Sequence, residues 1–208
     1  NILSAKILNR HQDNLDLLFV DGTTAATKVV LNEKNKSYID FVDKDNLTFL
    51  ADNSFIWTSE QDGFNHIYWY SKAGKLINQV TKGNWEVTEY YGFDEKNKTV
   101  FYQSTENGSI NRDVYRISLD GKNKTRLSQN LGTNAATFSP NFQYYINSFS
   151  SAVQPTTYTL NDAKTGKQIQ VIENNEALAS RLKAYELPSK EFFVLKTEKG
   201  NELNAWIL

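Results

Sequence analysis

Several residue types that usually carry chemistry are scarce or absent in this sequence of 208 residues. There is no cysteine, which excludes disulfides, thiol nucleophiles and thiolate metal sites. Only His11 and His66 could act as a general base near neutral pH. No apolar run approaches the roughly 20 residues of a membrane-spanning helix. Positive and negative charges nearly cancel, at a formal net charge of −1, so neither a nucleic-acid groove nor a surface for anionic membranes is indicated.

Both ends of the sequence resemble the interior of a longer chain. Methionine is absent, and the last residues form the apolar stretch NAWIL. The opening NILSAKILNRHQ is polar and alternating, which is unlike a secretory signal peptide. We therefore expect this chain to be a piece of a longer protein.

Short segments with alternating apolar and polar residues, separated by turn signals, fill most of the sequence. The run HIYWY (residues 66–70) alternates with period two, as FIWTSE (residues 55–60) does, and this pattern is typical of β-strands. Asp62-Gly63 between them is a strong turn signal. A second turn, SKAGK, leads into LINQVT. The pattern predicts a meander of short strands, with Glu60, Asp62 and His66 as hairpin residues rather than a reaction centre.

This layout recurs along the chain. The glycines of the second turn are Gly22, Gly74, Gly121 and Gly166, with spacings of 52, 47 and 45 residues. A four-stranded unit that repeats every ~40–50 residues indicates the blades of a β-propeller. We predict an all-β fold with a partial propeller over residues 1–173, divided into blades near 1–37, 38–82, 83–129 and 130–173. The first blade is a fragmentary copy.

The pattern changes after the last predicted blade. Leu178, Leu182 and Tyr185 have helical spacing, and Pro188 limits any continuation. We predict a short interdomain helix over 174–188. EFFVLKT and ELNAWIL then predict a hairpin over 189–208, the first hairpin of a further domain.

No motif in the sequence assembles a reaction centre. The G-x-S-x-G, H-E-x-x-H, EF-hand and glycine-rich phosphate-loop patterns are absent. We therefore expect no catalytic residue, no metal site and no cofactor in this chain. The stretch GNWEVTEYYGFD (residues 83–94), which contains Trp85, is open to two interpretations, either the entry to a blade or a recognition surface.

Three stretches carry a resemblance to a known family. TSEQDGFNHIYWY, INQVTKGNWEV and ISLDGKNKTRLS resemble, in order and spacing, the C-terminal half of the propeller of dipeptidyl peptidase IV, a family of serine exopeptidases in the prolyl oligopeptidase group. YELPSKEFFVLKTEKGNELNAWIL is similar to the family's crossing into its α/β-hydrolase domain. The resemblance covers essentially the whole chain.

The resemblance implies a fold and a division of labour. About four blades of an eight-bladed propeller would be present, followed by the helix and the first hairpin of an α/β-hydrolase domain that is itself absent. The catalytic triad would lie beyond Leu208, so the fragment alone is expected to be inactive. The parent would release X-Pro or X-Ala dipeptides from the N-termini of peptides, with the propeller gating and positioning the substrate.

The resemblance also points to one segment that would face the substrate. The family has an aromatic residue and an arginine at an extended subsite, and the matching segment here is SYIDFVDKDNLTF (residues 37–49). It offers Phe41 and Asp43 as substrate-binding candidates, but it has aspartates where the arginine is expected.

The expected partners are a peptide substrate, the chain's own hydrolase domain and possible formation of a homodimer, without nucleic acid and without a membrane span in this fragment. An exported bacterial protein of the periplasm or cell envelope is expected. Two other interpretations stay open, the propeller of a prolyl tripeptidyl or acylaminoacyl peptidase, and a non-catalytic propeller that binds peptides or glycans.

Overall fold

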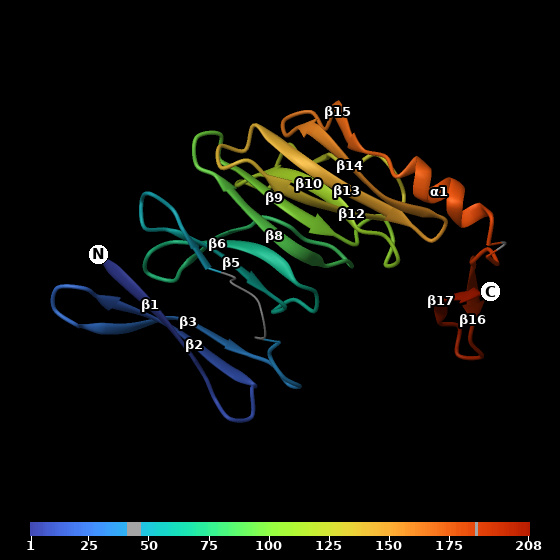
Figure 1. Cartoon of the computed structure of the whole chain (residues 1–208). Helices are drawn as coiled ribbons and strands as arrows, with labels where there is room; N and C mark the ends of the chain where they lie inside the picture. Colours follow the sequence, from blue (N-terminus) through green and yellow to red (C-terminus); the bar gives the residue numbers. More distant parts are fainter. Residues whose placement is uncertain (41–46, 186) are drawn as a thin grey trace. The chain divides into compact units, whose positions relative to one another are not determined.

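The computed structural model of the chain describes residues 1–40, 47–185 and 187–208 (Figure 1). Strands dominate these residues, and one α-helix is found among them. By contacts the chain divides into two compact units, residues 1–100 with 117–123 and residues 101–116 with 124–208.

The strands form successive antiparallel sheets in which neighbours in sequence are neighbours in the sheet (Figure 1). Sheet 1 has three strands, sheets 2, 3 and 4 have four each, and a two-stranded hairpin follows the helix. Sheet 1 contains β1 (Ile2–Leu8), β2 (Asn14–Asp21) and β3 (Thr27–Lys34). Sheet 2 contains β4 (Leu47–Phe49), β5 (Phe55–Ser59), β6 (His66–Tyr70) and β7 (Leu76–Gln79). Sheet 3 contains β8 (Val87–Asp94), β9 (Thr99–Ser104), β10 (Asp113–Ser118) and β11 (Thr125–Arg126). Sheet 4 contains β12 (Thr133–Phe138), β13 (Tyr144–Ser151), β14 (Gln154–Asp162) and β15 (Gln168–Glu173).

The helix and the terminal hairpin follow sheet 4. Helix α1 spans Glu176–Lys183, inside the range expected for it, and the hairpin pairs β16 (Glu191–Lys196) with β17 (Glu202–Ile207). The predicted all-β fold of four-stranded sheets with one short helix and a final hairpin is confirmed. The boundaries between blades and between domains stay predictions.

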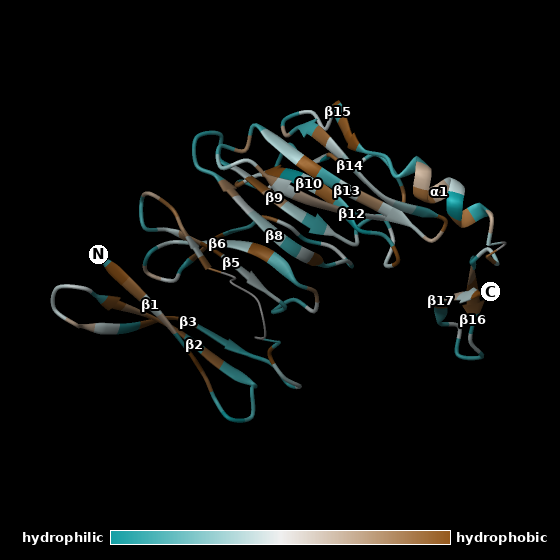
Figure 2. Cartoon of the chain, viewed as in Figure 1, coloured by the Kyte–Doolittle hydropathy of each residue, from teal (hydrophilic) through white to brown (hydrophobic). Residues whose placement is uncertain are grey.

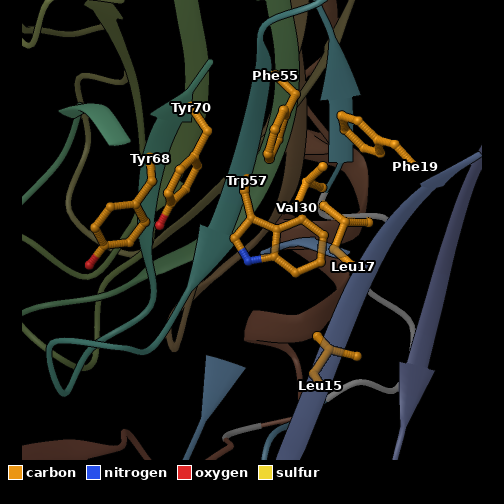
Figure 3. Close-up of a cluster of buried hydrophobic side chains, with 8 residues drawn as sticks. All are labelled: Leu15, Leu17, Phe19, Val30, Phe55, Trp57, Tyr68 and Tyr70. Atoms are coloured by element: carbon orange, nitrogen blue, oxygen red, sulfur yellow. The ribbon is translucent and has the colours of Figure 1, made fainter. Parts of the chain in front are cut away.

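Period-two alternation explains how sheets 1 and 2 share a core. One face of β2 and one face of each of β5 and β6 are apolar and buried, and their side chains point toward one another (Figure 3). Apolar and polar residues also interchange along the strands elsewhere in the chain (Figure 2). Aromatic rings contact one another in this core: the ring centroid of Phe55 lies 5.4 Å from that of Tyr70 in a stacked pair and 5.2 Å from that of Phe19 edge to face. The cluster consists of Leu15, Leu17, Phe19, Val30, Phe55, Trp57, Tyr68 and Tyr70.

The repeating glycines have a packing reason. Gly74, in the turn before β7, has φ +83°, and a Cβ there would lie 1.6 Å from the carbonyl oxygen of Val30 in sheet 1. Gly166, in the turn before β15, has φ +74°, and a Cβ there would lie 2.5 Å from the carbonyl oxygen of Leu127, which follows β11. In both places the turn presses against the backbone at or just after the last strand of the preceding sheet, where only glycine fits.

Hydrogen bonds connect each of two sheets to the strand that opens the next one. The residue just before β6, Asn65, exchanges two bonds with Val87, through Val87 N to Asn65 O at 2.8 Å and Asn65 Nδ2 to Val87 O at 2.7 Å. The residue just before β10, Arg112, donates to Gly132 O and accepts from Asn134 N, both at 2.8 Å. In both repeats, the residue just before the third strand of a sheet therefore bonds to the start of the next sheet.

Candidate functional site

The two substrate-binding candidates taken from the sequence, Phe41 and Asp43, fall in residues 41–46, outside the residues that the structure describes. They stay predictions. Ile39 and Asp40, which precede Phe41 in the sequence, are described and line a pocket.

A pocket of about 40 Å³ lies where β3 and β5 end. Three acidic residues, Glu33, Asp40 and Glu60, are among the residues that line it, together with Lys34. Its volume corresponds to about three water molecules. The surplus of negative charge suits a small cationic group such as an ammonium ion.

Glu33 is the best-defined of these groups. Its Oε1 accepts a hydrogen bond of 2.7 Å from Trp57 Nε1. Burial raises the pKa of Glu33, and the charge of Glu60 acts in the same direction, while hydrogen bonds from Ser59 and Trp57 oppose the shift. A carboxylate held in this way is positioned by the core of sheets 1 and 2, not by a surface loop.

Sequence reasoning missed Glu33, although a signal for it was present. On β3 it lies two residues after Leu31, and the register places it opposite Leu15 of β2. A glutamate therefore occupies a position where the alternation of the strand expects an apolar side chain. Trp57 Nε1 supplies the hydrogen-bond donor that makes the glutamate acceptable there.

His66 has a structural role, as the sequence predicted. Its side chain is 0% exposed, and its ring nitrogens lie 3.1 Å from Thr81 Oγ1 and 3.0 Å from Gly83 O. Trp85 packs edge-on against the imidazole at 4.8 Å between ring centroids. Thr81 Oγ1 also accepts the backbone N–H of Ile67 at 2.9 Å. These contacts join the end of sheet 2 to the stretch before β8, which favours the blade-entry interpretation of Trp85.

The described part of the chain shows little else that could carry out a reaction. Within residues 1–40, 47–185 and 187–208, no group of three or more His, Asp or Glu side chains could hold a metal ion. In the same residues, no helix is long and apolar enough to cross a membrane.

Comparison with curated proteins gives a consistent set of relatives. Dipeptidyl peptidase 4 of Arthroderma otae is 36% identical over 155 residues, which cover 73% of this chain and 20% of that protein. Dipeptidyl peptidase 4 of Trichophyton equinum is 30% identical over 209 residues, which cover 96% of this chain and 26% of that protein. The chain thus spans about a fifth to a quarter of the length of these relatives.

Comparison with solved structures extends the likeness to the fold. The crystal structure of Porphyromonas gingivalis dipeptidyl peptidase 4 matches with a TM-score of 0.91 and 44% identity, over 99% of this chain and 29% of that one. The four sheets are accordingly blades of a β-propeller of the kind found in dipeptidyl peptidase IV-like proteins.

The family is shown by a match over most of the sequence. The family model described as "Dipeptidyl peptidase IV (DPP IV) N-terminal region" matches residues 1–156. This range ends within β14, so it includes sheets 1 to 3 and the first strands of sheet 4. The chain belongs to the dipeptidyl peptidase IV N-terminal region family.

Proposed function

We propose that this chain is the non-catalytic propeller portion of a serine-type dipeptidyl peptidase that releases X-Pro and X-Ala dipeptides from peptide N-termini. The observation that carries the proposal is the similarity to Porphyromonas gingivalis dipeptidyl peptidase 4, at 44% identity and a TM-score of 0.91 over 99% of the chain. Similarity at this level along the whole chain supports the same role for the corresponding part of the parent protein.

The fold suggests what the propeller contributes to the reaction. The bonds of Asn65 with Val87, and of Arg112 with Gly132 and Asn134, tie each of these sheets to the next strand. Sheets fastened in this way can hold a peptide in one orientation while the serine of an attached hydrolase domain attacks it. The propeller would thereby contribute orientation and access, and the hydrolase domain would contribute the nucleophile and the donors for the oxyanion.

The pocket lined by Glu33, Asp40 and Glu60 would let the propeller distinguish substrates by their charge. These three acidic residues line it against the single positive charge of Lys34, so negative charge is in excess there. Under the proposed function, a substrate with a cationic group near this surface is held better than one with an anionic group. Further parts of the proposal are that the parent protein is exported and that its propeller packs against its own hydrolase domain.

The test is an assay of the parent protein on Gly-Pro-p-nitroanilide and Ala-Ala-p-nitroanilide, with this 208-residue chain as a control. We expect the parent to release p-nitroaniline from both substrates and the isolated chain to release none. Cleavage only of an X-X-Pro or an N-acylated substrate would instead assign the parent to the tripeptidyl or acylaminoacyl peptidases. A parent that is inert on all of them, yet retains peptides on a column, would be a binding module.

A further inference from the structure

Sheet 4 contains a buried polar atom that has no partner. Asn147, on β13, is 9% exposed, and its Nδ2 donates to Asn134 Oδ1 at 3.2 Å. Its Oδ1 is buried and has no hydrogen-bond partner among the described residues. Because a buried acceptor without a donor is unfavourable, a bound group that donates to this oxygen would stabilise the fold.

Asn147 lines a pocket of about 70 Å³ on the face of sheet 4. Alternate residues of β13 and β14 form its floor, and the segment 127–130 after β11 forms its side. The register pairs Asn147 with Thr159, so their side chains are neighbours on this face. The floor consists of Tyr145, Asn147, Phe149, Thr157, Thr159 and Asn161.

The side chains that line this pocket carry no charge. Amides and hydroxyls predominate, and the Tyr145 phenol donates to Leu127 O at 3.1 Å. Burial raises the pKa of Tyr145, with the negative charge of Asp162 acting in the same direction, so the phenol stays neutral. An ion would lose its hydration here without gaining a counter-charge, which disfavours charged ligands.

The hydrogen-bond roles of the pocket are complementary. Asn147 Oδ1 can only accept. Thr159 Oγ1 accepts from Asn161 Nδ2 at 2.9 Å, which leaves its own hydroxyl hydrogen free to donate. A ligand that both donates and accepts satisfies both groups, and a hydroxyl is the smallest group able to do so.

We propose that this pocket is a binding site for neutral hydroxyl groups, which donate to Asn147 Oδ1 and accept from Thr159 Oγ1. Two sources share this chemistry, ordered water and a small polyol. The volume admits about five water molecules, or one polyol of similar bulk. The proposal is independent of any peptidase activity of the parent protein.

The first test is a pair of high-resolution crystal structures of the parent protein, one free of polyols and one grown with glycerol. We expect an oxygen within about 2.7–3.2 Å of Asn147 Oδ1 in both. Water in both structures assigns the site to solvent, and a glycerol hydroxyl in the second assigns it to polyols. An empty pocket in both, or a protein donor on Asn147 Oδ1, overturns the proposal.

A substitution test reports on the same site in solution. Thr159→Val removes the hydroxyl that faces the pocket and keeps the bond between Asn147 and Asn134. In an occupied pocket the substitution removes two hydrogen bonds, the one that Thr159 Oγ1 accepts from Asn161 Nδ2 and the one that it donates to the bound hydroxyl, so we expect the midpoint of thermal unfolding to fall by roughly 4 °C. Thr133→Val, at an exposed position of β12, is the matched control and should leave the midpoint unchanged. A fall of only about half this size, which the loss of the Asn161 bond alone would produce, or no fall relative to the control, contradicts an occupied pocket.

Discussion

Sheets 2 and 4 have the same antiparallel pairing of strands but carry very different side chains. In sheet 2, the pairs across β5 and β6 are aromatic, Phe55 with Tyr70 and Trp57 with Tyr68. In sheet 4, the pairs across β13 and β14 are mostly polar, Tyr145 with Asn161, Asn147 with Thr159 and Phe149 with Thr157. The repeat therefore fixes the strand pairing and leaves the chemistry of the face free to vary.

The two faces also differ in how completely they are filled. The aromatic face of sheet 2 packs against Leu15, Leu17 and Phe19 of sheet 1, and Trp57 is 0% exposed (Figure 3). The polar face of sheet 4 lines a pocket of about 70 Å³. Large rings fill the space beside a sheet, whereas short amides and hydroxyls leave room that a polar ligand can occupy.

The largest expected loss of stability comes from removing an aromatic side chain from the core of sheets 1 and 2. Trp57→Ala removes the largest fully buried side chain of the core and leaves a cavity between sheets 1 and 2. Truncations of this kind cost about 3–5 kcal/mol. We expect a clearly lower midpoint of unfolding in calorimetry of the parent protein, with faster hydrogen exchange in the peptides that contain β5 and β6.

Trp57→Phe separates packing from hydrogen bonding in the same position. It keeps a smaller ring in the cluster and removes the bond from Nε1 to Glu33. We expect a loss of about 1–3 kcal/mol, smaller than for alanine. Equal losses for the two variants would show that the bond, and not the ring, stabilises this face.

An intermediate loss of stability is expected where a turn of one sheet packs against the backbone of the preceding sheet. Gly74→Ala places a Cβ 1.6 Å from Val30 O at φ +83°, so the turn and the neighbouring strand must move apart. Gly200→Ala has nearly the same φ, +81°, with nothing within 4 Å of the added Cβ. The left-handed conformation alone costs about 1–2 kcal/mol, and the clash adds about 1–3 kcal/mol. Unfolding midpoints should therefore fall further for Gly74→Ala, and similar values would show that the approach of the sheets is not a constraint.

The features that could be predicted from the sequence are those that repeat. Alternation in HIYWY predicted β6, and the spacing of Gly74, Gly121 and Gly166 predicted the repeat of four-stranded sheets. The structural role of His66 was also predicted, because a histidine within an alternating strand is more often a structural residue than a catalytic one. Such signals are local, since a period of two fixes which face a side chain occupies.

The features that could not be predicted depend on contacts between sheets. The role of Glu33 requires knowing that Trp57, 24 residues away in sequence, presents its Nε1 to the carboxylate. The unsatisfied oxygen of Asn147 likewise follows from its packing and not from its neighbours in sequence. For Phe41 and Asp43 the question is still open, because they lie outside the described residues.

The smallest expected change in stability comes from Glu33, a polar group beside the apolar core of sheets 1 and 2. Burial raises the pKa of Glu33 above its ordinary value of 4.5, so the folded protein holds this proton more tightly than the unfolded chain does. Below about pH 4.5 the carboxyl is neutral in both states and costs nothing; as the pH rises through the folded-state pKa, ionisation makes Glu33 destabilising. Glu33→Gln keeps an acceptor for Trp57 and should raise the midpoint of unfolding at pH 7, with a gain that shrinks toward zero on acidification to pH 4.

Glu95→Gln, on an exposed residue paired with Lys98, is the control and should show no such trend. A gain for Glu33→Gln that grew as the pH fell would mean that the charged carboxylate stabilises this core.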